Sequence, residues 1–263
     1  MKAKKNYGYG RLEEILTPSP NRVEPECAFA RQCGGCQLQA LSYEKQLEFK
    51  AGKVKGHLER IGGFTDIPME EILGMEQPFH YRNKAQFPVG KSKDGRIITG
   101  FYAGRTHSII ENRDCALGVT RNKEVLDRVI AHMEKFHIQP YDENTGKGLV
   151  RHVLIRYGFF TDEMMVCLII NGEELPGEDA LVKSLREIPE TVSVMVNVNK
   201  KRNNVILGET VRLLWGKPYI TDKIGEISYQ ISPLSFFQVN PYQTGRLYGK
   251  ALEYADLTSN ETV

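Results

Sequence analysis

Three cysteines gather in the stretch CAFARQCGGCQ, within ten residues of a chain that has only five cysteines. Five residues separate Cys27 from Cys33, and two residues separate Cys33 from Cys36. The intervening Gly34 and Gly35 accept left-handed backbone conformations without a Cβ penalty, so we expect them to let the loop fold tightly. Three thiolates in such a loop predict a metal centre that needs a fourth ligand.

The two remaining cysteines have different surroundings. Cys115 lies in the polar stretch ENRDCALG, and Cys167 lies in the apolar run MMVCLII. Free cysteine is among the most buried residue types, so we expect Cys167 to be a core residue. Cys115 is then the natural fourth ligand.

Zinc and a 4Fe–4S cluster both accept four thiolates. Zinc ribbons usually have two CxxC pairs, whereas this chain has one, and no histidine has good zinc-ligand spacing. The five-residue first gap also differs from the CxxxCxxC triplet typical of radical chemistry. The pattern favours a structural iron–sulfur cluster, and unrelated free thiols are the weaker alternative.

The composition limits the classes of protein to which this chain can belong. The chain has 263 residues, 41% hydrophobic and 26% charged, as in an ordinary globular protein. It contains no apolar run of about 18 residues and no apolar segment behind its basic N-terminus. We therefore expect a cytoplasmic protein with reduced thiols and without a disulfide framework.

Helices are expected at four places, one of them GEDALVKSLREI, and three of them have a capping signal. Ser42 and Thr120 are expected to cap helices over 42–63 and 119–138, and Asn240 followed by Pro241 predicts a third helix start. Apolar residues recur at helical spacing, as Val125, Val129 and Met133 do. Strands are expected in between, in YRNKAQFPVG, RIITGFYAG, LVRHVLIRYG, EMMVCLIIN and TVSVMVNVN.

Residues 77–115 are locally basic, with seven Lys or Arg and three acidic residues, a balance of +4 in a chain of net charge +2. Such a segment can track RNA phosphates, with Arg82, Lys84 and Arg105 as the candidate contacts. The simpler interpretation is a solvated surface, and charge alone favours it.

The stretches CAFARQCGGCQLQALSYEKQLEFK, FHYRNKAQFPVG, RHVLIRYG and SPLSFFQVNPYQTGRLYGKAL occur in this order along nearly the whole chain. Together they resemble the bacterial RNA 5-methyluridine methyltransferases, especially the iron–sulfur branch that modifies uracil in 23S ribosomal RNA. The cysteine loop and FFQVN are the most specific parts of the resemblance.

The resemblance implies an α/β fold with three parts. Residues 1–26 would end an OB-like RNA-binding domain, residues 27–232 would form an α+β central domain with mixed or antiparallel sheets, and residues 233–263 would begin a Rossmann-like methyltransferase domain. It implies that Cys27, Cys33, Cys36 and Cys115 ligate the 4Fe–4S cluster. It also implies that Gln238 contacts S-adenosylmethionine and that ribosomal RNA is the partner of a monomer.

Phe236, just before Gln238, can stack on a base, although adjacent aromatic residues are more often core residues. The Gly-rich cofactor loop, the catalytic cysteine and the acidic base of the family have no counterpart in these residues. We therefore expect a chain shortened at both ends, without catalytic residues and inactive alone. The alternatives are a non-enzymatic iron–sulfur RNA-binding module and an electron-transfer protein.

Overall fold

The computed structural model describes residues 2–3, 5–10, 12–258 and 260–261. These residues form two compact units, which are described separately below. The smaller unit comprises residues 1–26 and 36–74, and the larger comprises residues 27–35 and 75–263. The domain boundaries expected at residues 26 and 232 stay predictions.

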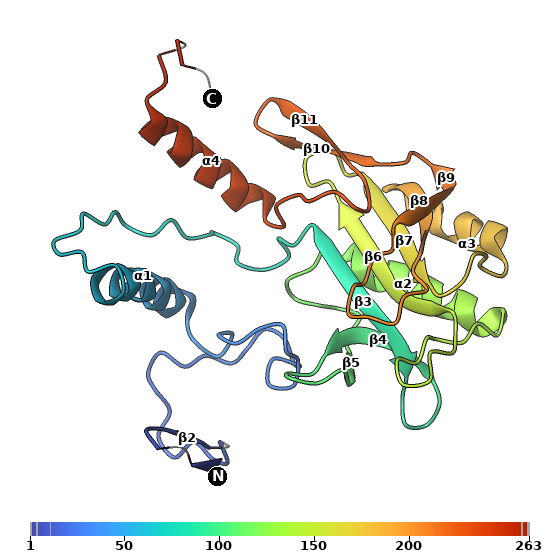
Figure 1. Ribbon diagram of the computed structural model, residues 1–263, viewed down its shortest axis with the longest axis horizontal. Helices are drawn as coiled ribbons and strands as arrows, with labels where there is room; N and C mark the ends of the chain where they lie inside the picture. Colours follow the sequence, from blue (N-terminus) through green and yellow to red (C-terminus); the bar gives the residue numbers. More distant parts are fainter. Residues whose placement is uncertain (1, 4, 11, 259, 262–263) are drawn as a thin grey trace. The chain divides into compact units, whose positions relative to one another are not determined.

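A seven-stranded sheet organises the larger unit, in the order β5-β4-β3-β6-β7-β8-β9 (Figure 1). Every neighbouring pair is antiparallel except β7 and β8. The mixed α/β fold with a mostly antiparallel sheet is therefore confirmed. Its strands are β3 (Lys84–Lys91), β4 (Ile97–Tyr102), β5 (Ile109–Glu111), β6 (Val150–Tyr157), β7 (Met164–Ile170), β8 (Thr191–Val198) and β9 (Thr210–Gly216).

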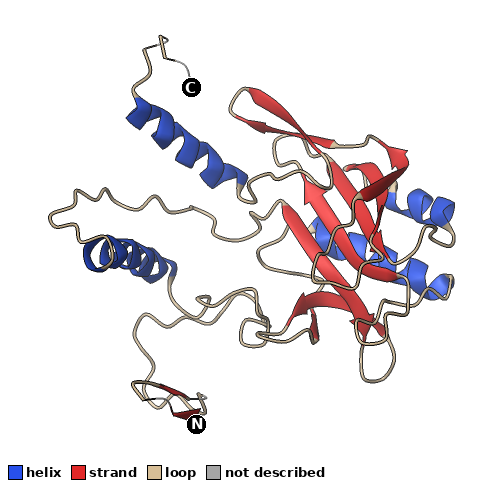
Figure 2. Cartoon of the chain, in the orientation of Figure 1, coloured by secondary structure: helices blue, strands red, loops and turns tan. Residues whose placement is uncertain are grey.

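Helices α2 (Arg121–Lys135) and α3 (Glu178–Leu185) cover one face of this sheet (Figure 2). The predicted apolar face of α2 is confirmed, because Val125, Val129 and Met133 are fully buried in the main core. Strand β7 is buried at every position, since it is central in the sheet and covered on both faces. Its near-continuous apolar sequence follows from that position.

The opposite face carries a second, smaller core. The hairpin β10 (Ile220–Ile224) and β11 (Ile227–Ile231) supplies Ile220 and Ile231 to it, against side chains of β6, β7 and β8. Residues after β11 lead to α4 (Pro241–Ala255). The Asn240 side chain accepts a hydrogen bond from the backbone N–H of Gln243 and Pro241 opens the helix, so this predicted helix start is confirmed.

The smaller unit contains β1 (Lys2–Ala3), β2 (Gly8–Tyr9) and α1 (Tyr43–Arg60). Ser42 caps α1 as predicted, through its hydroxyl and the backbone N–H of Lys45. No residue of α1 is buried, and Val54 is 53% exposed. The apolar spacing of α1 therefore does not mark a buried face in this structure. Among the described residues, no helix is long and apolar enough to cross a membrane.

Candidate functional site

Two cysteine-bearing segments of the larger unit meet at the hairpin of β4 and β5. Cys33 forms an isolated antiparallel bridge with Ala103, just after β4, and the N–H of Gly34 donates to the carbonyl of Tyr102 at 2.9 Å. Cys115 follows β5 in the chain. The structure thus ties the cysteine loop to the hairpin that leads to the predicted fourth ligand.

The structure explains the glycine at position 34 of CGGC differently from the sequence-based expectation. Neither Gly34 nor Gly35 has a positive φ, so neither uses the conformational freedom of glycine. A Cβ at Gly34 would instead lie 3.1 Å from the Tyr102 carbonyl oxygen and 3.1 Å from the Gly104 Cα. The loop requires glycine there because two backbones approach closely.

Two of the loop thiols accept contacts from N–H groups. The backbone N–H of Gly35 points to Cys33 Sγ at 3.4 Å, and Asn112 Nδ2 lies 3.8 Å from Cys27 Sγ. N–H donors to sulfur are typical of cluster ligands, so the surroundings of these residues fit a thiolate-bound group. Among the described residues, no group of three or more His, Cys, Asp or Glu side chains is arranged to hold a metal ion.

Cys167 differs from the loop cysteines. It is fully buried in the centre of β7, as predicted. Burial raises the pKa of its thiol to about 12, although the nearby Arg156 acts in the opposite direction. A thiol with this pKa is protonated at neutral pH and is a poor nucleophile.

A group of basic side chains lies at one end of the β3–β6 pair, where Lys84 is opposite Arg156. Burial first, and then the charges of Arg156 and Arg82, lower the pKa of Lys84. Burial also lowers the pKa of Arg156 to about 10. Because the two arginine charges lower the pKa of Lys84, an anion bound at this end is stabilising.

Residues 232–240 dock on this basic end. The Arg156 guanidinium donates to the carbonyls of Pro233, at 3.2 Å, and of Ser235. Asn83 donates from its backbone N–H to the Val239 carbonyl and from Nδ2 to the Gln238 carbonyl, at 3.0 and 2.8 Å. The structure therefore brings the predicted cofactor residue Gln238 to the same end of the sheet as Arg82 and Lys84.

The two phenylalanines of FFQVN have different environments. Phe236 is 84% exposed, whereas Phe237 packs against the second core beside Tyr229. An exposed aromatic ring can stack on a base. The base-stacking role of Phe236 stays a prediction, while Phe237 is a packing residue.

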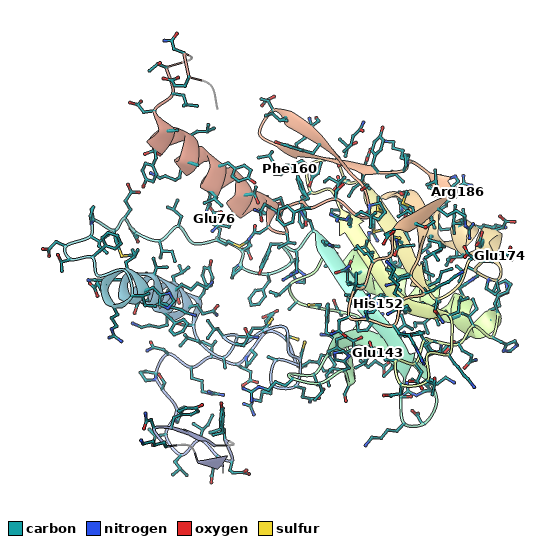
Figure 3. The ribbon with its side chains drawn as sticks, viewed as in Figure 1. Glu76, Glu143, His152, Phe160, Glu174 and Arg186 are labelled. Carbon is teal, nitrogen blue, oxygen red and sulfur yellow. The ribbon has the colours of Figure 1, made fainter. Side chains whose placement is uncertain are left out.

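An aromatic pocket of about 370 Å³ opens at the start of α4. Its walls include Phe79, Phe159 and Tyr242, and the rings of Phe159 and Tyr242 are 5.7 Å apart. Its lining also includes Glu76, which Figure 3 labels. A carboxylate oxygen of Glu76 lies 3.5 Å from a guanidinium nitrogen of Arg246 in α4. This pocket was not predicted, because its residues are far apart in sequence and resemble core aromatics.

The other basic residues of segment 77–115 do not join this group. Arg105 lies in the turn between β4 and β5, exposed and with a φ of 63°. Arg96 pairs with Asp94 and Arg113 pairs with Asp127, each at 2.8 Å, so acidic neighbours neutralise both. The predicted RNA contact at Arg105 is therefore separate from those at Arg82 and Lys84.

The sequence analysis did not predict a role for Arg156, whose guanidinium hydrogen-bonds the backbone of residues 232–240. A signal for it existed, because RHVLIRYG places basic side chains in a strand whose other residues are apolar. A charge in a buried strand needs a partner, and here the partners are backbone carbonyls.

The chain is similar in sequence to bacterial RNA methyltransferases. Proteins named uncharacterized RNA methyltransferase are 47% identical to it in Clostridium tetani, and also 47% identical in Halalkalibacterium halodurans. Each match covers 100% of this chain and 57% of the relative, so the chain spans little more than half the length of these relatives. No family model matches the chain.

A solved structure agrees with the sequence similarity. The Pyrococcus abyssi tRNA (uracil-54, C5)-methyltransferase in complex with S-adenosyl-L-homocysteine superposes with a TM-score of 0.70 at 29% identity. The match covers 91% of this chain and 53% of that one. The shared part therefore includes most of the elements described above.

Proposed function

We propose that this chain serves in an RNA methyltransferase that moves a methyl group from S-adenosylmethionine to C5 of a uracil in 23S ribosomal RNA. The observation that carries the proposal is the basic end of the β3–β6 pair with Arg82 and Lys84, on which the segment that holds Gln238 and the exposed Phe236 docks through Asn83. The similarity to RNA methyltransferases supports it.

In this proposal the basic end binds RNA phosphates and Phe236 stacks on a base. Gln238 offers an amide that can hydrogen-bond the polar groups of S-adenosylmethionine, which supplies the methyl group when bound. The backbone of Gln238 is fixed by Asn83, so this amide starts from a defined position. The chain's own residues thus bind and orient, and the proposal assigns none of them to bond making.

The properties of the thiols agree with a chain that binds and orients its ligands without making bonds. Uracil methylation at C5 proceeds through addition of a cysteine thiolate to C6. The buried Cys167, with its raised pKa, is unsuited to that task. We assign Cys27, Cys33 and Cys115, together with Cys36 by its spacing, to a structural 4Fe–4S cluster.

Iron and sulfide analysis of the chain purified without air tests the cluster. We expect about four iron and four sulfide per chain. The variants Cys27→Ser, Cys33→Ser and Cys115→Ser should lose most of the iron, whereas the matched control Cys167→Ser should keep it. Stoichiometric zinc without iron, or equal iron in all four variants, contradicts the assignment.

Methyl transfer to RNA tests the activity. We expect no turnover from this chain alone, since four of its thiols are assigned to the cluster and the fifth, that of Cys167, is buried with a raised pKa. Turnover by this chain alone would contradict the proposal that none of its described residues takes part in bond making. A protein that spans the full length of the relatives should methylate a 23S fragment, and preference for a tRNA instead would correct the target.

The same thiol observation favours a second candidate, a non-enzymatic iron–sulfur module that binds RNA through its basic end. Its binding should weaken steeply with salt and show little sequence preference. Retention of full RNA affinity without any methyl transfer, in a protein of the relatives' full length, would support this alternative.

A further inference from the structure

A second basic region lies at the other end of the β3–β6 pair. β3 and β6 are antiparallel, with Lys84 opposite Arg156 at one end and Pro88 opposite His152 towards the other. A cleft of about 980 Å³ opens there, lined by the ends of β3, β4 and β6 and by residues 139–148. It is larger than the aromatic pocket and shares no residue with it.

A β-bulge shapes the floor of this cleft. The register between β6 and β7 shifts between Val150 and His152, so Arg151 is the extra residue, and both Arg151 and His152 line the cleft. Bulges turn side chains away from the regular alternation and are frequent beside functional sites. The Arg151 guanidinium is fixed by the carbonyls of Asn199 and Lys201, at 2.8 and 2.9 Å.

His152 offers an unused polar atom. The residue is only 6% exposed, and its Nδ1 has no hydrogen-bond partner among the described residues. Burial first, and then the charge of Arg151, lower its pKa to about 4, so the ring is neutral at physiological pH. A neutral imidazole offers one donor and one acceptor, which is the complement of a base edge.

An aromatic platform stands beside it. The rings of Tyr102 and His107 are stacked, with centroids 4.8 Å apart and planes 14° from parallel. Glu143 holds both rings, since it accepts from the Tyr102 hydroxyl at 3.4 Å and lies 2.6 Å from His107 Nδ1. The side chain of His107 is 59% exposed, so a further flat ring can stack on it. Figure 3 labels Glu143 and His152 in this part of the unit.

Three exposed lysines line the same cleft, namely Lys91, Lys93 and Lys147. Within the described part of the chain, none of them forms an ion pair. Exposed lysines elsewhere in the unit do, as in Lys200–Glu173, Lys201–Glu209 and Lys217–Glu163. Cations without a carboxylate partner beside a ring platform are the arrangement that binds single-stranded nucleic acid.

We propose that this cleft binds an unpaired nucleotide of the RNA, apart from the basic end that carries Gln238. The base stacks on His107 with its edge towards His152 Nδ1, and the phosphates follow Lys91, Lys93 and Lys147. This inference takes only one point from the proposed function, namely that the partner is RNA. It adds a second contact region at the far end of the sheet.

Fluorescence anisotropy with a labelled single-stranded oligoribonucleotide of mixed sequence tests the cleft. The triple variant Lys91→Ala/Lys93→Ala/Lys147→Ala should lower the salt slope of log K by about 2, since each phosphate contact on a single strand contributes about 0.7. His107→Ala should weaken binding by about tenfold, the loss expected for one stacked base. The matched control Lys200→Ala/Lys201→Ala removes two paired lysines and should bind like wild type.

Both kinds of variant change exposed side chains, and unchanged far-UV circular dichroism checks that they fold. If the triple variant and His107→Ala both keep the wild-type affinity and salt slope, the proposal that this cleft binds RNA is wrong. RNA binding by the wild-type chain would then still support the proposed function. If the wild-type chain does not bind RNA, both the proposal for the cleft and the proposal of RNA as the partner are wrong. Photocrosslinks from 4-thiouridine in the oligoribonucleotide should map to the cleft, and crosslinks confined to Phe236 contradict it.

Discussion

The two ends of the β3–β6 pair are both basic, but their cations differ in what they contact. At the end near Gln238, Arg156 is 2% exposed and donates to backbone carbonyls of residues 232–240. At the other end, Lys91 and Lys93 are exposed at the rim of the cleft. A buried cation with backbone partners stabilises the fold, whereas an exposed unpaired cation is available to a ligand. Burial, rather than charge, separates the two roles, and the exposed Arg82 beside the buried Arg156 keeps the ligand-binding role proposed for it above.

The sharpest test of this contrast removes the buried cation. Arg156→Ala deletes the donors to Pro233 and Ser235 and leaves their carbonyls without these partners. We expect the free energy of unfolding to fall by about 3 kcal/mol, measured by urea denaturation. Arg82→Ala at the same end removes an exposed charge and should change stability by less than about 0.5 kcal/mol. Equal stability of the two variants would remove the distinction.

The next effect concerns the buried histidine of the cleft. Its folded pKa, about 4, is below the usual value of 6.5, so the unfolded chain binds the proton more readily between these values. The contribution of the neutral His152 ring to the free energy of unfolding is therefore complete above pH 6.5, and it is lost as the pH falls towards 4. Between pH 7 and pH 5 this loss amounts to about 2 kcal/mol.

Urea denaturation of His152→Gln at pH 7 and pH 5 measures that loss, and the variant should show a flatter pH dependence than wild type. The charged neighbours Arg151, Glu143 and His107 stay in place in both proteins, so the difference isolates the imidazole. His137→Gln, at an exposed histidine, is the matched control and should follow the wild-type curve. Parallel curves for His152→Gln and wild type would show that this ring is not held neutral.

Much of the fold follows from local patterns. The burial of Val125, Val129 and Met133 on α2 was readable from their helical spacing, and the burial of Cys167 from its apolar run. Asn240 capped its helix as its position before a proline indicated. In each case neighbours in the sequence decide the outcome, so a local pattern is sufficient.

The cleft was not readable in the same way. Tyr102 and His107 belong to the β4–β5 hairpin, whereas Glu143 and His152 come from later segments that only the tertiary fold brings to this cleft. The bulge at Arg151 depends on the register of two strands, which no single segment determines. The need for glycine at position 34 likewise arises from a backbone contact with Tyr102. Tertiary pairing supplied what the sequence pattern lacked.

A smaller effect is expected at the residue that fixes Gln238. Asn83→Ala removes the side-chain donor to the Gln238 carbonyl and keeps the backbone hydrogen bond to Val239. We expect a loss of about 1 kcal/mol in urea denaturation. Limited proteolysis should also cut residues 232–240 faster than in wild type. Asn203→Ala, at an exposed position, should change neither measurement.

The smallest expected effect on stability completes the contrast between the ends. Lys91→Ala/Lys93→Ala removes two exposed cations that have no ion pair among the described residues, so folding loses no electrostatic partner. The free energy of unfolding should stay within about 0.5 kcal/mol of wild type, although the same variant should bind RNA more weakly. A fall in stability as large as that of Arg156→Ala would mean that these lysines also hold the fold together. The two ends would then differ in exposure alone and share a structural role.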